Sequence, residues 1–429
     1  MILEHKSIAA ILIAAALIAR ASAQDRDRTA PPIAPQQTVT IDQAVDEAVA
    51  RNLNLLAERF NVKVADAAVL TASLKPNPVV TVNFVFPDQI LVDAGISPHE
   101  QVFRTDYVFE RGGKRERRVD QATLSKSVAE LQLLNISRSL VLDVESAFID
   151  VQLAKLNLAL AQDNLQAFNN VVQINTERVR TGDLSQVELS RSRLAALQFQ
   201  NDVRQQDTKL RVARNRLSTL VGRGPNGDAL DVTGELRKDP QTMGYDAVRR
   251  QALEMRPDLR AMRTDQARSV ADLRLQLANG KIDYTVSGEY HRQEGAEVRG
   301  NSYAVFFSAP LPIFNRNQGD IARAQVQQEQ LKTRVQALET DISTDVSNAY
   351  AQYSTTRQIV DTIEQQMLTQ AQDVRMTTEY SYRRGEASFV EFLDAVRAFN
   401  DTMHSYNDAR AEHARSLYTL DALSGKVNP

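Results

Sequence analysis

The stretch LVLDVESAFIDVQLAKLNLALAQDNLQAFNNVV, residues 140–172, decides the fold of this 429-residue chain. Its small and apolar residues recur at alternating steps of four and three, which is the a/d pattern of a coiled-coil helix. The seam residues are Leu140, Val144, Ala147, Val151, Ala154, Leu158, Ala161, Leu165, Phe168 and Val172. No proline lies between Pro98 and Pro225. We therefore predict one unbroken helix over residues 114–181, roughly 100 Å long at 1.5 Å per residue.

The only glycine between residues 114 and 221 is Gly182, which ends this helix. A glycine at such a position favours a left-handed turn, and a second helix is predicted to run on to Leu220. A helical hairpin follows from this pattern.

The second half of the chain repeats the hairpin. Its seam begins at Ile342, 202 positions after Leu140, and its turn glycine, Gly385, lies 203 positions after Gly182. The second seam is Ile342, Val346, Ala349, Tyr353, Thr356, Val360, Ile363, Met367, Gln370 and Val374. The repetition indicates an internal duplication, with a long helix from about Asp320 to Tyr382 and a shorter one ending at Leu423.

A pair of amphipathic strands precedes each long helix. We predict strands over residues 79–90 and 101–111 in the first repeat, and over 282–292 and 301–311 in the second. Each has one aromatic, apolar face and one mostly polar face, and a length typical of membrane-spanning β-strands. Four strands are too few to close a barrel, because the smallest barrels have eight. We expect three copies to supply twelve.

The predicted fold class is therefore mainly α with a membrane β component. Long coiled-coil hairpins are expected to form an α-barrel, and four strands per chain to complete a twelve-stranded β-barrel in a trimer. The first structural repeat is predicted over residues 39–222 and the second over 244–425, joined by an equatorial linker at 223–243.

The first 23 residues have the features of a secretory signal peptide. Lys6 precedes an apolar run from Ile8 to Ala19, and Ala21-Ser22-Ala23 forms an Ala-x-Ala cleavage site. The run is shorter than the ~20 residues that a membrane-spanning helix needs. We expect a flexible periplasmic segment, residues 24–38, to follow.

Composition excludes several function classes. The net charge of −3 argues against nucleic acid as a partner, and the absence of cysteine removes thiolate metal sites and cysteine nucleophiles. His404 and His413 are nine positions apart, which is not the spacing of a metal pair on one helix face. His413 falls on the second seam and is expected to be packed there. We predict no catalytic residue, metal site or cofactor, and hence not an enzyme.

Two short strings resemble a known family. Glu110-Arg111-Gly112-Gly113-Lys114-Arg115 and the segment PLPIFNRNQG, residues 310–319, are similar to the heavy-metal (CzcC-like) branch of the TolC-type outer-membrane efflux proteins. Ile41-Asp42-Gln43-Ala44-Val45 resembles the first helix of that family. The strings themselves are expected to end strands and start helices, with Asn315 or Asn317 as the helix cap.

The resemblance implies a passive duct in the outer membrane with a long periplasmic portion. It implies a homotrimer in contact with outer-membrane lipid, and as further partners a periplasmic adaptor protein and an inner-membrane pump, which we expect to be proton-driven. The cargo is then small solutes, with heavy-metal cations suggested by the branch.

The turns at Gly182 and Gly385 are expected to lie far from the strands. The resemblance implies that this end of the molecule is the periplasmic entrance. Glu391 and Asp394 share a helix face and match acidic residues at the family's entrance, where carboxylate rings would favour cations. Tyr382 matches a tyrosine that helps to hold that entrance shut. Glu188 is the first-repeat counterpart of Glu391, but the first-repeat position equivalent to Asp394 is occupied by Arg191. An equally open alternative makes both carboxylates a solvated face near a helix N-terminus.

The turns are also the loops that an adaptor would grip. The residues of this predicted docking surface are Arg180, Gly182, Asp183, Arg384, Gly385 and Glu386. Three other functions remain open: the duct of a protein-secretion system, a periplasmic adaptor, and a soluble coiled-coil scaffold. An adaptor is expected to have one hairpin rather than two, and a scaffold would not need the strands.

Overall fold

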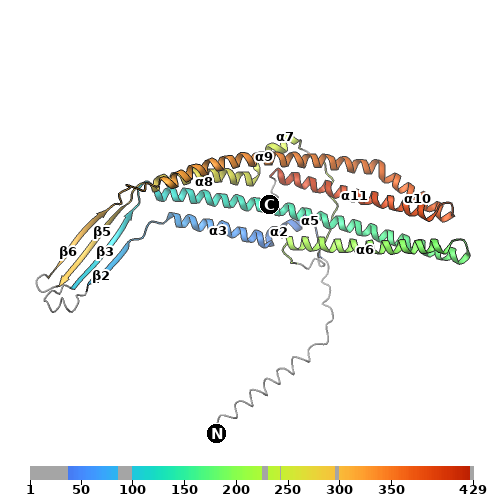
Figure 1. The fold of residues 1–429 in the computed structure, drawn as a ribbon, viewed down its shortest axis with the longest axis horizontal. Coiled ribbons are helices and arrows are strands. Elements are labelled where there is room, and N and C mark those ends of the chain that lie inside the picture. The colour runs from blue at the N-terminus through green and yellow to red at the C-terminus, as the bar shows by residue number, and fades with distance from the viewer. Residues whose placement is uncertain (1–36, 86–98, 225–229, 242, 295–298, 426–429) are drawn as a thin grey trace, which may run out of the picture.

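The computed structural model is elongated, with strands at one end and paired helices along the rest (Figure 1). It describes residues 37–85, 99–224, 230–241, 243–294 and 299–425. The predicted signal peptide, residues 24–36 of the predicted flexible segment and the part of the first predicted strand beyond residue 85 lie outside these ranges.

Each repeat places its helices and strands in the same order. In the first repeat these are α2 (Ile41–Arg51), α3 (Leu53–Ser73), β2 (Val79–Val85), β3 (His99–Phe109), α5 (Lys114–Thr181) and α6 (Gln186–Leu220). In the second they are α7 (Tyr245–Met255), α8 (Pro257–Asn279), β5 (Tyr284–Glu294), β6 (Arg299–Ser308), α9 (Gln318–Thr362), the π-helix η2 (Ile363–Met367), α10 (Leu368–Arg384) and α11 (Phe389–Leu423). Within the described residues, no helix is both long enough and apolar enough to cross a membrane.

The four long strands form one antiparallel sheet in the order β2-β3-β5-β6. The register aligns Val82, Phe103, Tyr290 and Tyr303 in one row across all four strands. Neighbouring rings in this row lie 6.2 and 5.3 Å apart, as cross-strand aromatic pairs do. The next row, on the opposite face, is the polar set Thr81, Arg104 and Glu289 with Ala304. One apolar and one polar face, as expected from the alternation, are thus present.

The observed strand ends differ from the predicted ones by a few residues. β3 ends at Phe109 because the chain turns at Gly112 and Gly113, both left-handed. β6 ends at Ser308, before Pro310 and Pro312, which have no N–H to donate to a ladder.

A small parallel sheet corrects the prediction for two segments. β1 (Gln37–Val39), at the end of the segment expected to be flexible, pairs with β4 (Leu230–Val232) in the predicted linker. Asp231 holds this linker on the helices, since its carboxylate is 2.9 Å from both Lys155 Nζ on α5 and Arg214 Nη2 on α6. Three-residue strands far apart in sequence give no local pattern to detect.

The long helix of the first repeat runs unbroken from Lys114 to Thr181, as predicted. Its seam packs as expected, since Val144, Ala147 and Val151 are fully buried beside α2 and α6 residues. In the second repeat, His413 is buried in the α9–α11 seam and stacks on Tyr353, with ring centroids 5.5 Å apart. The packed-seam prediction for His413 is confirmed.

The long helix of the second repeat is not a continuous α-helix, which corrects the prediction. A π-turn at η2 separates α9 from α10. The predicted seam holds as far as Ile363, which is buried, but Met367, Gln370 and Val374 are exposed. The π-turn contains one residue more than an α-turn, so it rotates the following residues away from the expected phase.

Gly222 allows the chain that follows α6 to pack against the end of α2. Its φ is +81°, and an added Cβ would lie 2.7 Å from the carbonyl oxygen of Arg51. Beside it, Asn52 Nδ2 donates to Leu220 O at 2.9 Å. The close backbone approach therefore requires glycine.

Replacing Gly222 by alanine is expected to lower the free energy of unfolding by at least about 1–2 kcal/mol, because a Cβ in a left-handed conformation is strained and the Arg51 carbonyl must also move. Denaturant unfolding in detergent measures the change. Gly319→Ala is the control, because Gly319 is helical and has open space around its Cα. Equal stability of the two variants would contradict this account.

Candidate functional site at the helical turns

The two hairpin turns lie together at the end of the molecule opposite the sheet (Figure 1). Gly182 and Gly385 cap α5 and α10 with φ of 86° and 81°. The backbone N–H of Asp183 donates to Arg178 O at 2.8 Å, and that of Glu386 to Ser381 O at 2.9 Å. Both turns therefore have the same glycine-capped geometry.

The predicted docking residues form two exposed, charged loops. Arg180 forms an ion pair with Glu177 at 2.8 Å, and Asp183 accepts a hydrogen bond from the Thr181 hydroxyl at 2.6 Å. In the second loop, Arg384 lies 3.9 Å from Glu386. The ionic partners are local, so each loop presents both signs of charge to solvent.

Glu391 caps the helix that follows the second turn. Its carboxylate accepts from the backbone N–H of Ser388 at 2.7 Å, and the Ser388 hydroxyl accepts from the N–H of Glu391 at 3.3 Å. This is a capping box. The hydrogen bonds from the Ser388 N–H and hydroxyl lower the pKa of Glu391. The carboxylate is therefore charged at neutral pH, and the cap weakens only as the pH falls through that lowered pKa.

The other two predicted acidic residues have different surroundings. Asp394 is exposed one turn after Glu391. Glu188 is half-buried in the first turn of α6, where Ser185 caps its N–H at 3.2 Å. Sequence equivalence of Glu188 and Glu391 thus does not give equivalent exposure, since Glu391 is exposed at the corresponding position of α11.

Tyr382 joins the two hairpins inside the protomer. Its hydroxyl donates to Asn175 Oδ1 at 2.8 Å, and the two side chains are 4% and 0% exposed. Its ring stacks on Phe392, with centroids 5.2 Å apart and planes within 5°. Burial raises the pKa of Tyr382, so the hydroxyl keeps its proton and remains a donor.

Asn175 and Arg178 are functional candidates that the sequence reasoning missed. The Arg178 guanidinium lies over the Tyr382 ring, 6.0 Å from its centroid, and donates weakly to Tyr382 O at 3.4 Å. Asn175 continues the first seam one step past Val172, and a polar residue at a seam position is a signal for a specific pairing. The Asn175 Nδ2 atom is buried without a hydrogen-bond partner, so the amide depends on Tyr382.

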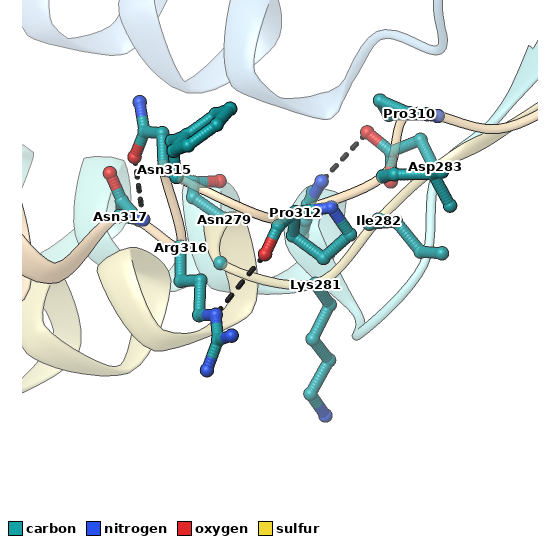
Figure 2. Close-up of a pocket in the computed structure, with 13 residues that line it drawn as sticks. Asn279, Lys281, Ile282, Asp283, Pro310, Pro312, Asn315, Arg316 and Asn317 are labelled. Carbon is teal, nitrogen blue, oxygen red and sulfur yellow. Dashed lines mark hydrogen bonds and ion pairs between the residues drawn. The ribbon is translucent and has the colours of Figure 1, made fainter.

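The two strings that carry the resemblance lie at the strand–helix junction instead, where the second string and Lys114 of the first help to line a cavity of about 510 Å³ (Figure 2). Lys114 Nζ is 2.7 Å from Asp283 Oδ2, and the Arg111 N–H donates to Asp283 Oδ1 at 2.9 Å. One carboxylate thus ties the first string to the start of β5. The string joins a strand to a helix, as its glycines suggested.

The helix cap predicted in the second string needs correction. Asn317 is the N-cap of α9, but its φ is 63° and its side chain makes no capping bond. Instead, Asn317 Nδ2 donates to Gln276 O at 2.8 Å. Asn315 Oδ1 accepts from the Asn317 N–H at 2.9 Å (Figure 2). The left-handed backbone turns the amide toward α8. In the described part of the chain, no three side chains of His, Asp or Glu are grouped to hold a metal ion.

Comparison with known proteins agrees with this architecture. A family model described as "Outer membrane efflux protein" matches residues 44–223 and 248–426. The cobalt-zinc-cadmium resistance protein CzcC of Cupriavidus metallidurans is 23% identical over 398 residues, covering 92% of this chain and 93% of that protein. The cation efflux system protein CusC of Escherichia coli K12 is 25% identical, covering 67% and 64% of the two chains.

The fold has solved counterparts. The outer-membrane channel OprN superposes with a TM-score of 0.76 at 18% identity, covering 93% of this chain and 95% of that one. The two structural repeats and their hairpins are therefore an established protomer architecture.

Replacing Tyr382 by phenylalanine is expected to loosen the contact between the hairpins. The change leaves the buried Asn175 amide without its partner, at a cost of about 1–3 kcal/mol. Hydrogen exchange of the turn amides measures the local opening. Tyr380→Phe, at a 55% exposed position on the same helix, is the matched control. Adding Asn175→Leu to Tyr382→Phe should recover most of the protection, and protection equal to the parent in the single variant would contradict the contact.

Proposed function

The chain belongs to the outer membrane efflux protein family, and from this premise we propose that it is the outer-membrane duct of a tripartite efflux system. Three copies form a continuous passage, with the sheet end in the membrane and the helices in the periplasm. The passage receives its cargo from an inner-membrane pump, expected to be proton-driven, through a periplasmic adaptor protein.

The observation that carries this proposal is the incomplete sheet. β2 and β6 are its outer strands, and neither has a second partner among the described residues. Tyr303, Val305 and Phe307 of β6 are 80%, 81% and 66% exposed on one face. Unpaired edges and an exposed apolar face are both costly in water. Closure with two further copies pairs every edge, and lipid covers the apolar face.

The periplasmic mouth is the proposed functional site. Tyr382 and Asn175 hold the second hairpin against the first and so keep the entrance narrow. Glu391 and Asp394, with a smaller contribution from the half-buried Glu188, place negative charge around it in three copies. Carboxylate rings of this kind favour cations over anions.

The exposed turns are the proposed docking surface for the adaptor. Arg180 and Asp183 in one loop, and Arg384 and Glu386 in the other, project beyond the helices at glycines that fix the turn. Gly182 and Gly385 contribute by shape, because their left-handed backbone sets the direction of each loop.

Heavy-metal cations are the proposed cargo class. The support is the similarity to CzcC and CusC, whose names describe cobalt-zinc-cadmium resistance and cation efflux. A passive duct takes its selectivity largely from its pump, so the residues of this chain contribute a preference for cations rather than recognition of one metal.

Detergent extraction of the outer-membrane fraction, followed by mass measurement, tests the duct. We expect a trimer that retains β-structure on mild heating and forms ion-conducting channels in planar bilayers. Recovery of the protein as a stable monomer, or in the soluble periplasm, would contradict the proposal.

The charge at the mouth is testable apart from the helix cap. Glu391→Gln keeps an oxygen that accepts from the Ser388 N–H while removing the charge, and Asp394→Asn removes the second charge. The double variant should fold as the parent does but lose cation preference and show weaker block by divalent cations. Glu188→Gln is the matched control and should have a smaller effect. If the double variant kept the ion selectivity of the parent, the proposal would be wrong, and both carboxylates would only be part of a solvated helix face.

A further inference from the structure

The two repeats differ by one residue, and the structure locates the difference. Ala161 and Ile363 are equivalent seam residues at an offset of 202, whereas Phe168 and Ala371 are equivalent at 203. The extra residue therefore lies between Ile363 and Leu368. The backbone N–H of Leu368 donates to Ile363 O, five residues back, which is the bond of a π-turn.

The π-turn decides which face of α10 meets its neighbours. After it, the covered residues follow the steps three, four, three and four: Leu368, Ala371, Arg375, Thr378 and Tyr382. The line that would continue the α9 seam without the π-turn is Met367, Gln370, Val374, Thr377 and Ser381. Met367 and Val374 on that second line are 43% and 53% exposed.

These two lines are neighbours on the helix surface. One residue of an α-helix corresponds to about 100° of rotation and 1.5 Å of rise. Conversion of the π-turn to α-helix would therefore turn α10 by that angle. Met367 and Val374 would move into the seam, and Tyr382 would leave Asn175.

We propose that α10 is a two-register element, and that the π-turn η2 is where it switches. In the observed register, Tyr382 bonds to Asn175 and the Arg375 guanidinium lies 4.7 Å from the Phe399 ring centroid. In the second register, η2 is α-helical, Val374 replaces Arg375 opposite Phe399, and Ser381 replaces Tyr382.

Each register has its own stabilising contacts. The observed one keeps the Tyr382–Asn175 bond, and the Tyr406 hydroxyl donates to Glu364 of the π-turn at 2.7 Å. The second register loses both hydrogen bonds. In their place it buries the side chains of Met367 and Val374 and has a regular ladder of helical hydrogen bonds. The Gly385 turn joins α10 to α11 and absorbs the small axial shift.

The first hairpin has no such element, because Ala161 and Leu165 keep the ordinary step of four within the continuous helix α5. The second hairpin alone would then release the mouth. This consequence rests on the proposed function of the turns, whereas the two registers do not.

Cysteine pairs test the registers directly, since the chain has no cysteine of its own. Arg375→Cys with Phe399→Cys reports the observed register, and Val374→Cys with Phe399→Cys the second. With a short bismaleimide on the purified protein, we expect the first pair to cross-link rapidly and the second slowly. Adding Tyr382→Phe should raise the rate of the second pair at least threefold, because it removes the bond that holds the observed register.

Deletion of Gln366 is the decisive variant. It restores the step of four between Ile363 and Leu368, so a continuous α-helix then presents the observed face. The Val374–Phe399 pair should fall to background while the Arg375–Phe399 pair still cross-links. Gln366→Ala keeps the length and should leave both rates unchanged. The two-register proposal would be wrong if the Val374–Phe399 pair failed to cross-link in the Tyr382→Phe background. It would also be wrong if that cross-link persisted after the deletion.

Conductance separates this proposal from the function of the mouth. The deletion is expected to lower the open probability in planar bilayers at least threefold. If the cross-linking pattern holds but the open probability does not change, the registers stand and their coupling to the mouth is wrong.

Discussion

The phase of the side chains along the long helices is the constraint on which the rest of the structure depends. A helix of 68 residues carries any error in phase along its whole length. A one-residue slip rotates every later side chain by about 100°. α5 holds its phase without interruption, and this places Phe168 and Asn175 on the same side as the buried Val144. In the second repeat the same result requires a π-turn, which compensates for one extra residue.

The contact between the two hairpins combines apolar clusters with paired polar side chains. Across α5 and α11, Arg415 pairs with Asp150 at 2.7 Å, and Asn407 Nδ2 donates to Asn157 Oδ1 at 3.0 Å. Near the turns the Tyr382–Asn175 bond follows. Paired polar groups specify register because a shifted partner leaves them unsatisfied. They also lose less than apolar side chains when the surfaces separate into water. Under the proposed function, this suits an interface that holds one alignment and can still separate.

The candidate functional site combines local and long-range roles in the same few residues. Glu391 caps its own helix and also contributes charge to the proposed mouth, so loss of its carboxylate has two separable effects. Tyr382 packs among Phe389 and Phe392 as a core residue, and its hydroxyl also forms a hydrogen bond that joins the two hairpins near the turns. The strings around residues 110–115 and 310–319, though more specific to the family, lie away from these residues and join strands to helices.

The sequence by itself determined the duplicated hairpins, the paired amphipathic strands and the glycine turns, because these follow from periodicity and from residues with restricted backbones. The family resemblance of the sequence also singled out Tyr382, Glu391 and Asp394, the last two together with their shared helix face near a turn. Only the tertiary structure decided the pairing of β1 with β4, the partnership of Tyr382 with Asn175 and the place of the π-turn. Each of these joins segments distant in the chain, or depends on which face a neighbouring helix covers. The offsets of 202 and 203 were present in the sequence, but packing alone decides where a helix accommodates the extra residue.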